Sequence, residues 1–216
     1  MQRLRIRFCR GQELKFISHL DILRLWQRVL HRAEIPPAYS EGFNPHPRIS
    51  LAAPLPIRVT SQAELMDILC NKWGSPHFLT AAVSQQLPPG IEIAQVYQIA
   101  LTMPPLQSQV RYAEYRVDVE TEKGLKEIES AISNLLSTEH LPWHHQRDTG
   151  RRSYDLRALI DDLCLIDWHN SNCTIGMRLR CDNRGSGRPE QVISALGFTH
   201  YPHIIHRIKL ILEARQ

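Results

Sequence analysis

Two successive passes of strand-like and helix-like hydrophobic patterns run along this sequence of 216 residues. The first pass opens with an alternating stretch at 2–9, in which Leu4, Ile6 and Phe8 fall on one face. The remaining predicted elements of this pass are a helix at 18–33, a strand at 49–57, a segment at 63–71 that suits a helix or a strand, a helix at 75–86 and a strand at 91–97. The predicted order over residues 1–102 is therefore β-α-β-β-α-β.

A similar order returns after the Pro-containing stretch 103–109, which we expect to be a linker. The elements predicted beyond it are a strand at 115–119, a helix at 125–136, a strand at 143–160 that turns at 148–150, a strand at 175–181, a helix at 189–197 and a strand at 208–212. A helical turn within 156–165 is also compatible with the pattern. Two such passes predict an α+β chain of tandem ferredoxin-like domains with antiparallel sheets, covering 1–102 and 110–216.

Several classes of protein are disfavoured by the sequence. The chain has no apolar run of the roughly 18–20 residues that a membrane helix needs and no signal-peptide core, so we expect a cytoplasmic protein that does not meet the membrane. The five cysteines are scattered without a CxxC pair, which argues against disulfides, a metal site and an iron–sulfur cluster built by this chain. We expect them to be small buried hydrophobic residues. No Walker, Rossmann or Gly-x-Ser-x-Gly motif is present.

Positive charge is concentrated in the first 60 residues, which contain ten Arg or Lys side chains and four acidic ones. The rest of the chain has a slight acidic excess. Nine of those ten bases are arginine, the residue best suited to bidentate contacts with phosphate or carboxylate. A local positive field of this kind fits an anionic partner such as RNA, DNA or a phosphorylated ligand, although a solvated basic surface would give the same pattern.

The predicted helix at 18–33 begins with residues that suit a helix cap. Ser18 and Asp21 match the capping arrangement and are expected to be structural. His19 lies at the first helical position, where capping does not require it, so it is a candidate phosphate donor, metal ligand or acid–base group. Arg24 and Arg28 follow on one face, either as a solvated stripe or as a phosphate clamp.

The segment 38–48 predicts a stiff, turn-rich loop. Gly42 is expected to supply a positive φ, and Pro45 helps to rigidify the backbone. Phe43 would either stack on a nucleobase or fill the core beneath the loop. Three polar residues project from this base: Asn44, His46 and Arg48. We expect His19 and Arg24 to meet these three in one cationic pocket for a phosphate or a flipped nucleotide.

These residues resemble a known family. The segments 15–24, 32–36 and 39–48 are similar to the signature of the radical-SAM-linked protein family, whose members occur alone or fused behind a radical-SAM domain. The similarity covers about residues 2–60 and is weaker in the second half, at 154–157 and 188–189. The resemblance implies a partner that uses S-adenosylmethionine and an iron–sulfur cluster, and it gives no established reaction.

The leading hypothesis is an accessory module that binds tRNA or rRNA, is not an enzyme on its own, and works with a radical-SAM modification enzyme. A second hypothesis is an RNA-modifying enzyme that resembles pseudouridine synthases in architecture. Those enzymes use an aspartate nucleophile, and the one aspartate in the signature, Asp21, already has a capping role. A third is a subunit that docks its basic stripe on a radical-SAM protein.

Overall fold

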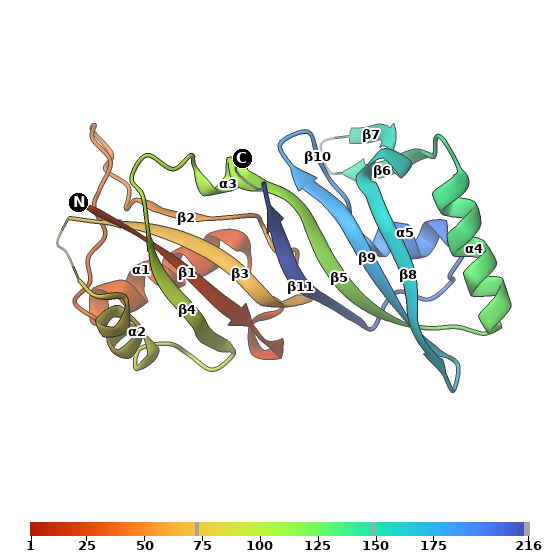
Figure 1. Ribbon diagram of the computed structural model, residues 1–216, viewed down its shortest axis with the longest axis horizontal. Coiled ribbons are helices and arrows are strands. Elements are labelled where there is room, and N and C mark those ends of the chain that lie inside the picture. Colours follow the sequence, from red (N-terminus) through yellow and green to blue (C-terminus); the bar gives the residue numbers. More distant parts are fainter. Residues whose placement is uncertain (72–73, 148–149, 214–216) are drawn as a thin grey trace. The chain divides into compact units, whose positions relative to one another are not determined.

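The computed structural model describes residues 1–71, 74–147 and 150–213. The chain divides into two compact units, unit 1 from Met1 to Val110 with the end of the chain from Leu212, and unit 2 from Arg111 to Ile211. The segment 103–109, predicted as a linker, lies in unit 1 and contains the short helix α3 (Leu106–Gln109). Both units combine helices with largely antiparallel strands, which confirms the α+β prediction at this level (Figure 1).

Unit 1 is built on four strands and two longer helices. Its elements are β1 (Gln2–Arg10), the 3-10 helix η1 (Gln12–Leu14), α1 (His19–Arg32), β2 (Ile49–Leu51), β3 (Val59–Cys70), α2 (Pro76–Ser84) and β4 (Ile91–Ile99). The strand order is β4-β1-β3-β2, and each neighbouring pair is antiparallel. The ambiguous segment 63–71 is therefore part of a strand, and the predicted strand at 49–57 is limited to three residues.

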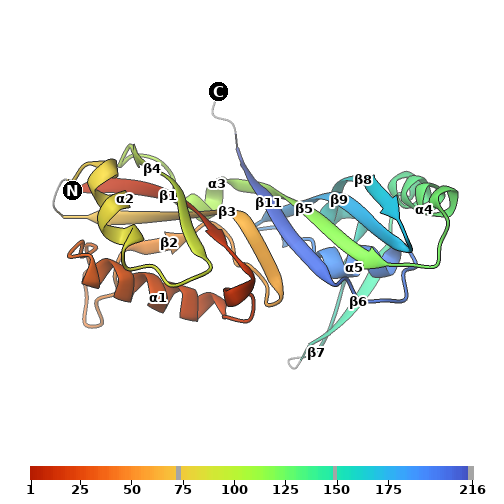
Figure 2. The same ribbon diagram turned by 90° about the horizontal axis from the view of Figure 1, so that it is seen from below.

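The core of unit 1 lies between the sheet and its helices. Leu4, Ile6 and Phe8 of β1 are buried, as the alternation predicts. Trp26 of α1 is completely buried and meets Phe8 edge-to-face, with ring centroids 5.0 Å apart. Ring pairs of this geometry stabilise a core beyond the area they bury. α1 is thereby fixed along the sheet (Figure 2).

Unit 2 has a similar element order with an inserted hairpin. Its elements are β5 (Val110–Glu120), α4 (Leu125–Ser137), β6 (Pro142–Arg147), β7 (Gly150–Asp155), the 3-10 helix η2 (Arg157–Leu159), β8 (Ile160–His169), β9 (Asn172–Asp182), β10 (Gly185–Ser186), α5 (Pro189–Ala195) and β11 (Ile204–Leu212). The main strand order is β11-β5-β9-β8, with β10 also on β9. β6 and β7 pair only with each other in the described chain, so the predicted strand at 143–160 is mostly a separate hairpin. Its last residues form η2 and the start of β8, which gives the helical turn that 156–165 also allowed.

The five cysteines differ in how far they are exposed to solvent. All five cysteines are free, but Cys164 is exposed and Cys9 half-buried, so the expectation that all five are buried is wrong. β8 turns Cys164 outward because it lies on the strand face that the core does not cover. A bilayer-spanning helix requires a long apolar run, and no helix in the described part of the chain has one.

Candidate nucleic-acid interface

The segment 38–48 forms a hairpin, here called the tip hairpin. Ser40 donates its backbone N–H to the carbonyl of His46 at 2.8 Å and accepts the N–H of His46 on its side-chain oxygen at 2.9 Å. Tyr39 and Pro47 form an isolated bridge below this pair. Gly42 has a φ of +116°, a region that side chains with a Cβ rarely adopt. The hairpin therefore has a defined backbone.

Phe43 lies at the tip of this hairpin with its side chain completely exposed. It does not fill the core, so of the two roles open to it, stacking on a ligand ring is the one compatible with its position. Asn44 and His46, which follow Phe43 along the chain, are also exposed. Glu41, on the other side of Gly42, adds one negative charge to the tip. The tip thus presents an aromatic ring together with polar groups that can donate and accept hydrogen bonds.

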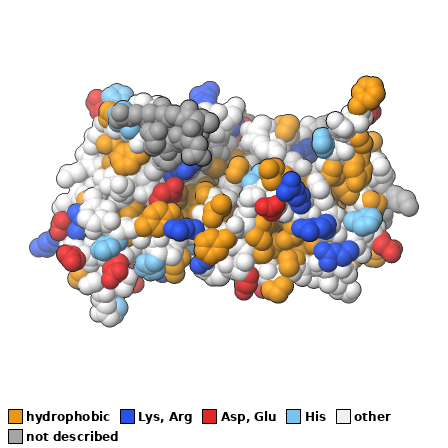
Figure 3. Space-filling view, turned by 180° about the vertical axis from the view of Figure 1, so that it is seen from behind, with side chains coloured by type: hydrophobic (Ala, Val, Ile, Leu, Met, Phe, Trp, Pro, Cys, Tyr) orange, Lys and Arg blue, Asp and Glu red, His pale blue; other side chains and the backbone are white. Residues whose placement is uncertain are grey.

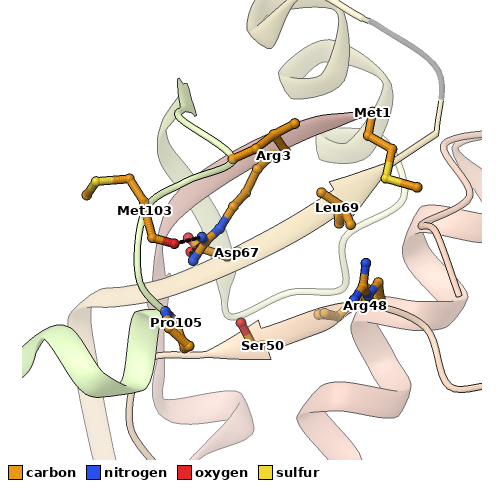
Figure 4. A pocket seen from close by; sticks show the side chains of 10 residues that line it. Met1, Arg3, Arg48, Ser50, Asp67, Leu69, Met103 and Pro105 are labelled. Carbon is orange, nitrogen blue, oxygen red and sulfur yellow. Dashed lines mark hydrogen bonds and ion pairs between the residues drawn. The ribbon is translucent and has the colours of Figure 1, made fainter. Parts of the chain in front are cut away.

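Arg48 ends the tip hairpin and lines a hollow of about 500 Å³, here called the arginine pocket. Its polar lining is Arg3, Arg48, Ser50 and Asp67, and Leu69 and Met103 are among its apolar walls. Figure 4 shows Arg3 lying against Asp67 on the sheet while Arg48 enters from the start of β2. The Arg48 side chain is exposed, and no ion pair or hydrogen bond to it is found among the described residues. Its guanidinium is free for a ligand.

The floor of the arginine pocket is a buried ion cluster. Asp67 accepts hydrogen bonds from Arg3 at 2.7 and 3.0 Å and from Arg5 at 2.7 and 3.0 Å. Arg3 also donates to the carbonyls of Met103 and Pro104. Burial on its own lowers the pKa of Arg5, but the hydrogen bonds and the charge of Asp67 outweigh it, so that pKa is raised. This aspartate is occupied by two arginines and is therefore a structural group.

The start of α1 is formed as the sequence predicts. The Ser18 hydroxyl accepts the backbone N–H of Asp21 at 3.2 Å and donates to the Asp21 carboxylate at 2.7 Å. Arg24 pairs with the same carboxylate at 3.0 Å, with both side chains well exposed. Those hydrogen bonds from Ser18 and Arg24 lower the pKa of Asp21. Ser18 thus caps the helix, Asp21 holds the Ser18 hydroxyl from the third helical position, and Arg24 is not a free cation.

The structure does not bring the five predicted pocket residues together. The backbone carbonyl of Arg48 accepts the N–H of Leu69, and Leu69 pairs with Arg3 near the start of β1. The charged groups that act on the pKa of His19 are Glu64, which pairs with Phe8 near the end of β1, and Arg10. Five residues of strand separate these positions along β3, roughly 17 Å. The prediction of one pocket is wrong because α1 runs back along the sheet, leaving its start and the tip hairpin at opposite ends (Figures 1 and 2).

His19 contributes to pH dependence instead. Burial lowers its pKa, the charge of Arg10 adds to that effect, and Glu64 opposes it. Between the two pKa values the unfolded chain binds more protons at this histidine than the folded chain does. The free energy of unfolding should therefore decrease as the pH falls below the usual histidine value of 6.5, and it should level off below the pKa of His19 in the folded chain. We expect His19→Gln to reduce this slope in urea unfolding series measured between neutral and acidic pH. An unchanged slope would contradict this role.

Arg28 lies apart from the tip hairpin. It is exposed, and with Arg32 it lines a hollow of about 460 Å³ between α1 and the residues 85–88 that follow α2. Arg32 donates to the carbonyl of Arg28 at 3.4 Å, whereas no partner of the Arg28 side chain is found in the described chain. Figure 3 shows basic side chains lying among hydrophobic ones on one face of the molecule. The arginines of the predicted basic stripe are thus exposed along α1, and Arg24 at its start is paired with Asp21.

Sequence reasoning missed both the ion cluster and the arginine pocket. The available signal was the spacing of Leu65, Asp67 and Leu69 at every second residue. In a strand this spacing places the carboxylate of Asp67 on the same face as the two leucines. No group of three possible metal ligands occurs among the described residues.

Comparison with known proteins identifies the family. The model of the family described as "Uncharacterized protein conserved in bacteria (DUF2344)" matches residues 3–189. The chain belongs to this family. No curated protein sequence matches the chain of this DUF2344 member.

Solved structures give a likeness of fold. A chain of the crystal structure of a Cbf5-Nop10-Gar1 complex is similar, with a TM-score of 0.55 and 9% identity over 96% of this chain and 48% of that one. A chain of the archaeal box H/ACA sRNP Nop10-Cbf5 complex gives a TM-score of 0.47 at 8% identity, covering 95% of this chain and 46% of that one. The DUF2344 chain therefore spans about half the length of these two chains.

Proposed function

We propose that this DUF2344 protein is an RNA-binding accessory module whose tip hairpin and arginine pocket hold an unpaired stretch of RNA. The observation that carries the proposal is the completely exposed ring of Phe43 at the tip of a hydrogen-bonded hairpin. The same hairpin ends at Arg48, whose guanidinium is free in the described chain. Single-stranded RNA is held by stacking on aromatic rings and by cations that follow its phosphates. In this proposal Phe43 stacks on a base and Arg48 binds a phosphate.

The finer parts of the proposal rest on the resemblance to the radical-SAM-linked family. The RNA is a tRNA or rRNA, and the partner is a radical-SAM protein that contributes S-adenosylmethionine and an iron–sulfur cluster. This chain positions the RNA and performs no reaction of its own. The supporting architecture is a tandem ferredoxin-like arrangement, and the strand orders β4-β1-β3-β2 and β11-β5-β9-β8 support it. Asn44 and His46 contribute base selectivity beside the stacked ring.

The proposal is tested by titrating a labelled single-stranded RNA with the full chain at several salt concentrations. Phe43→Ala should weaken binding by about 1–3 kcal/mol at every salt concentration, because it removes one stacked base. Arg48→Ala should lower the slope of log K against log salt by about 0.7, the contribution of one phosphate contact with single-stranded nucleic acid.

The matched control is Arg184→Ala, which removes an exposed arginine from a turn in unit 2. We expect it to leave both the affinity and the salt slope unchanged. Absence of RNA binding by the wild-type chain would contradict the proposal. So would an Arg48→Ala variant with the wild-type salt slope.

A further inference from the structure

Another hollow lies on the helix side of unit 1, and the arginine pocket does not include it. It encloses about 440 Å³ between the end of α1, the start of α2 and the base of the tip hairpin. Leu4, Cys70 and Leu79 line it as buried apolar groups. Tyr39 and Phe78 line it too, and they remain 57% and 60% exposed. We call it the aromatic hollow, since two partly exposed rings belong to its wall.

The walls of the aromatic hollow are held in place by hydrogen bonds. The buried Gln2 side chain donates to the carbonyl of Gly74 at 3.0 Å and accepts the Gly74 N–H at 2.9 Å. On the hairpin side, Ala38 donates to the carbonyl of Leu69 at 2.7 Å, and Pro37 bridges to Cys70. The shape therefore exists before any ligand arrives, which reduces the ordering cost of binding.

The chemistry of the lining favours a flat, uncharged ring. Apart from Gln2, whose amide is held by Gly74, the buried groups at the hollow are apolar and offer dispersion contacts to the faces of a ring. Asn71 adds a further amide to the lining. Glu34 is exposed and also lines the hollow, and its negative charge disfavours a phosphate there. Unpaired RNA bases meet these requirements, since proteins hold them against aromatic side chains and read their edges with polar groups.

A place for the attached phosphate lies along the same seam between α1 and α2. The hollow lined by Arg28 and Arg32 also has walls from both α1 and the segment after α2. Arg32 is two residues before Glu34, which lines the aromatic hollow. The free Arg28 guanidinium can therefore neutralise the sugar-phosphate backbone while the base turns away from it.

We infer that the aromatic hollow receives a second unstacked nucleobase of the bound RNA, in addition to the base stacked on Phe43. This inference rests on the proposed function and narrows the ligand to RNA that is single-stranded at the site. The bound RNA passes the base of the tip hairpin, because Tyr39 lines the aromatic hollow and Arg48 lines the arginine pocket.

Two measurements with the full chain test this inference. The first is the affinity for an oligouridylate of about twelve nucleotides, within the site sizes of single-strand binders. Phe78→Ala should raise Kd by about fivefold or more, because it removes a stacking ring far from Phe43 in sequence. The control is Phe16→Ala, which removes a similarly exposed ring that does not line the aromatic hollow and should change Kd by less than about twofold. The second measurement is photocrosslinking of the same RNA carrying 4-thiouridine, followed by peptide mapping.

The outcomes separate the inference from the proposed function. Crosslinks to the peptides that contain Phe78 or Tyr39, together with the loss in Phe78→Ala, support the aromatic hollow as a base site. Binding that depends on Phe43 and Arg48 but is unchanged in Phe78→Ala, with no crosslink at Phe78, overturns the inference alone. If the wild-type chain binds no oligouridylate or other RNA, the proposed function fails first.

Discussion

Asp67→Asn is expected to lower the free energy of unfolding by about 3–5 kcal/mol, because removing one partner leaves buried charge without compensation. The side chains of Arg5 and Asp67 are 3% and 4% exposed, and the carboxylate is the acidic partner of both Arg3 and Arg5. An asparagine is nearly the same size but carries no charge, so the guanidinium groups of Arg3 and Arg5 would lose the carboxylate that both of them pair with. Urea unfolding followed by circular dichroism measures this change.

The control for this prediction is Asp161→Asn. Asp161 pairs with Arg178 at 3.4 Å, and both side chains are substantially exposed. Solvent-exposed pairs contribute at most about 1 kcal/mol, so this variant should unfold almost as the wild type does. If Asp67→Asn and Asp161→Asn changed stability equally, the ion cluster would not be the structural element described above.

Trp26→Ala is expected to cost about 3–5 kcal/mol of stability, because it leaves a large cavity beneath α1. The residue is completely buried and packs against Phe8. Its indole N–H has no hydrogen-bond partner in the part of the chain that is described. Trp26→Phe keeps a ring in place and removes that unpaired donor, so its cost should be much smaller. Thermal and urea unfolding of the two variants provide the comparison, and equal losses would contradict this account of the core.

The order of elements in unit 1 could be predicted because its patterns are local. Alternation at 2–9 and helical spacing at 18–33 correspond to β1 and α1 almost residue by residue. The segment 63–71 was ambiguous for a physical reason. β3 is buried along most of its length, so it lacks the clean alternation of a strand with one solvated face. Its pairing with β1 and β2 identifies it as a strand.

The buried charges could not be predicted from the local pattern. Arg3, Arg5 and Arg7 alternate with apolar residues and indicate a solvated strand face. In the structure Arg7 is exposed, but Arg5 is buried because Asp67, 62 residues further along the chain, lies opposite it in the register. The position of such a counter-ion depends on the register between strands, which the sequence of either strand alone does not determine.

The sequence predicted the exposed residues of the tip hairpin but not which other residues lie beside them. The stiff loop with Phe43, Asn44, His46 and Arg48 is a hairpin, and its polar residues are exposed as expected. The expected meeting with His19 and Arg24 fails because α1 has 14 residues and is therefore about 21 Å long. His19 stands at its first residue, whereas the tip hairpin follows its last one. Sequence spacing alone does not tell in which direction a helix crosses its sheet.

The most direct test of RNA binding at the tip hairpin is to crosslink the full-length protein to RNA in cells, recover the bound RNA and map the crosslinked peptides. The account predicts enrichment of a defined tRNA or rRNA species and crosslinks within residues 38–48, which are lost in Phe43→Ala. Recovery of no enriched RNA, or crosslinks confined to residues outside unit 1, would contradict it.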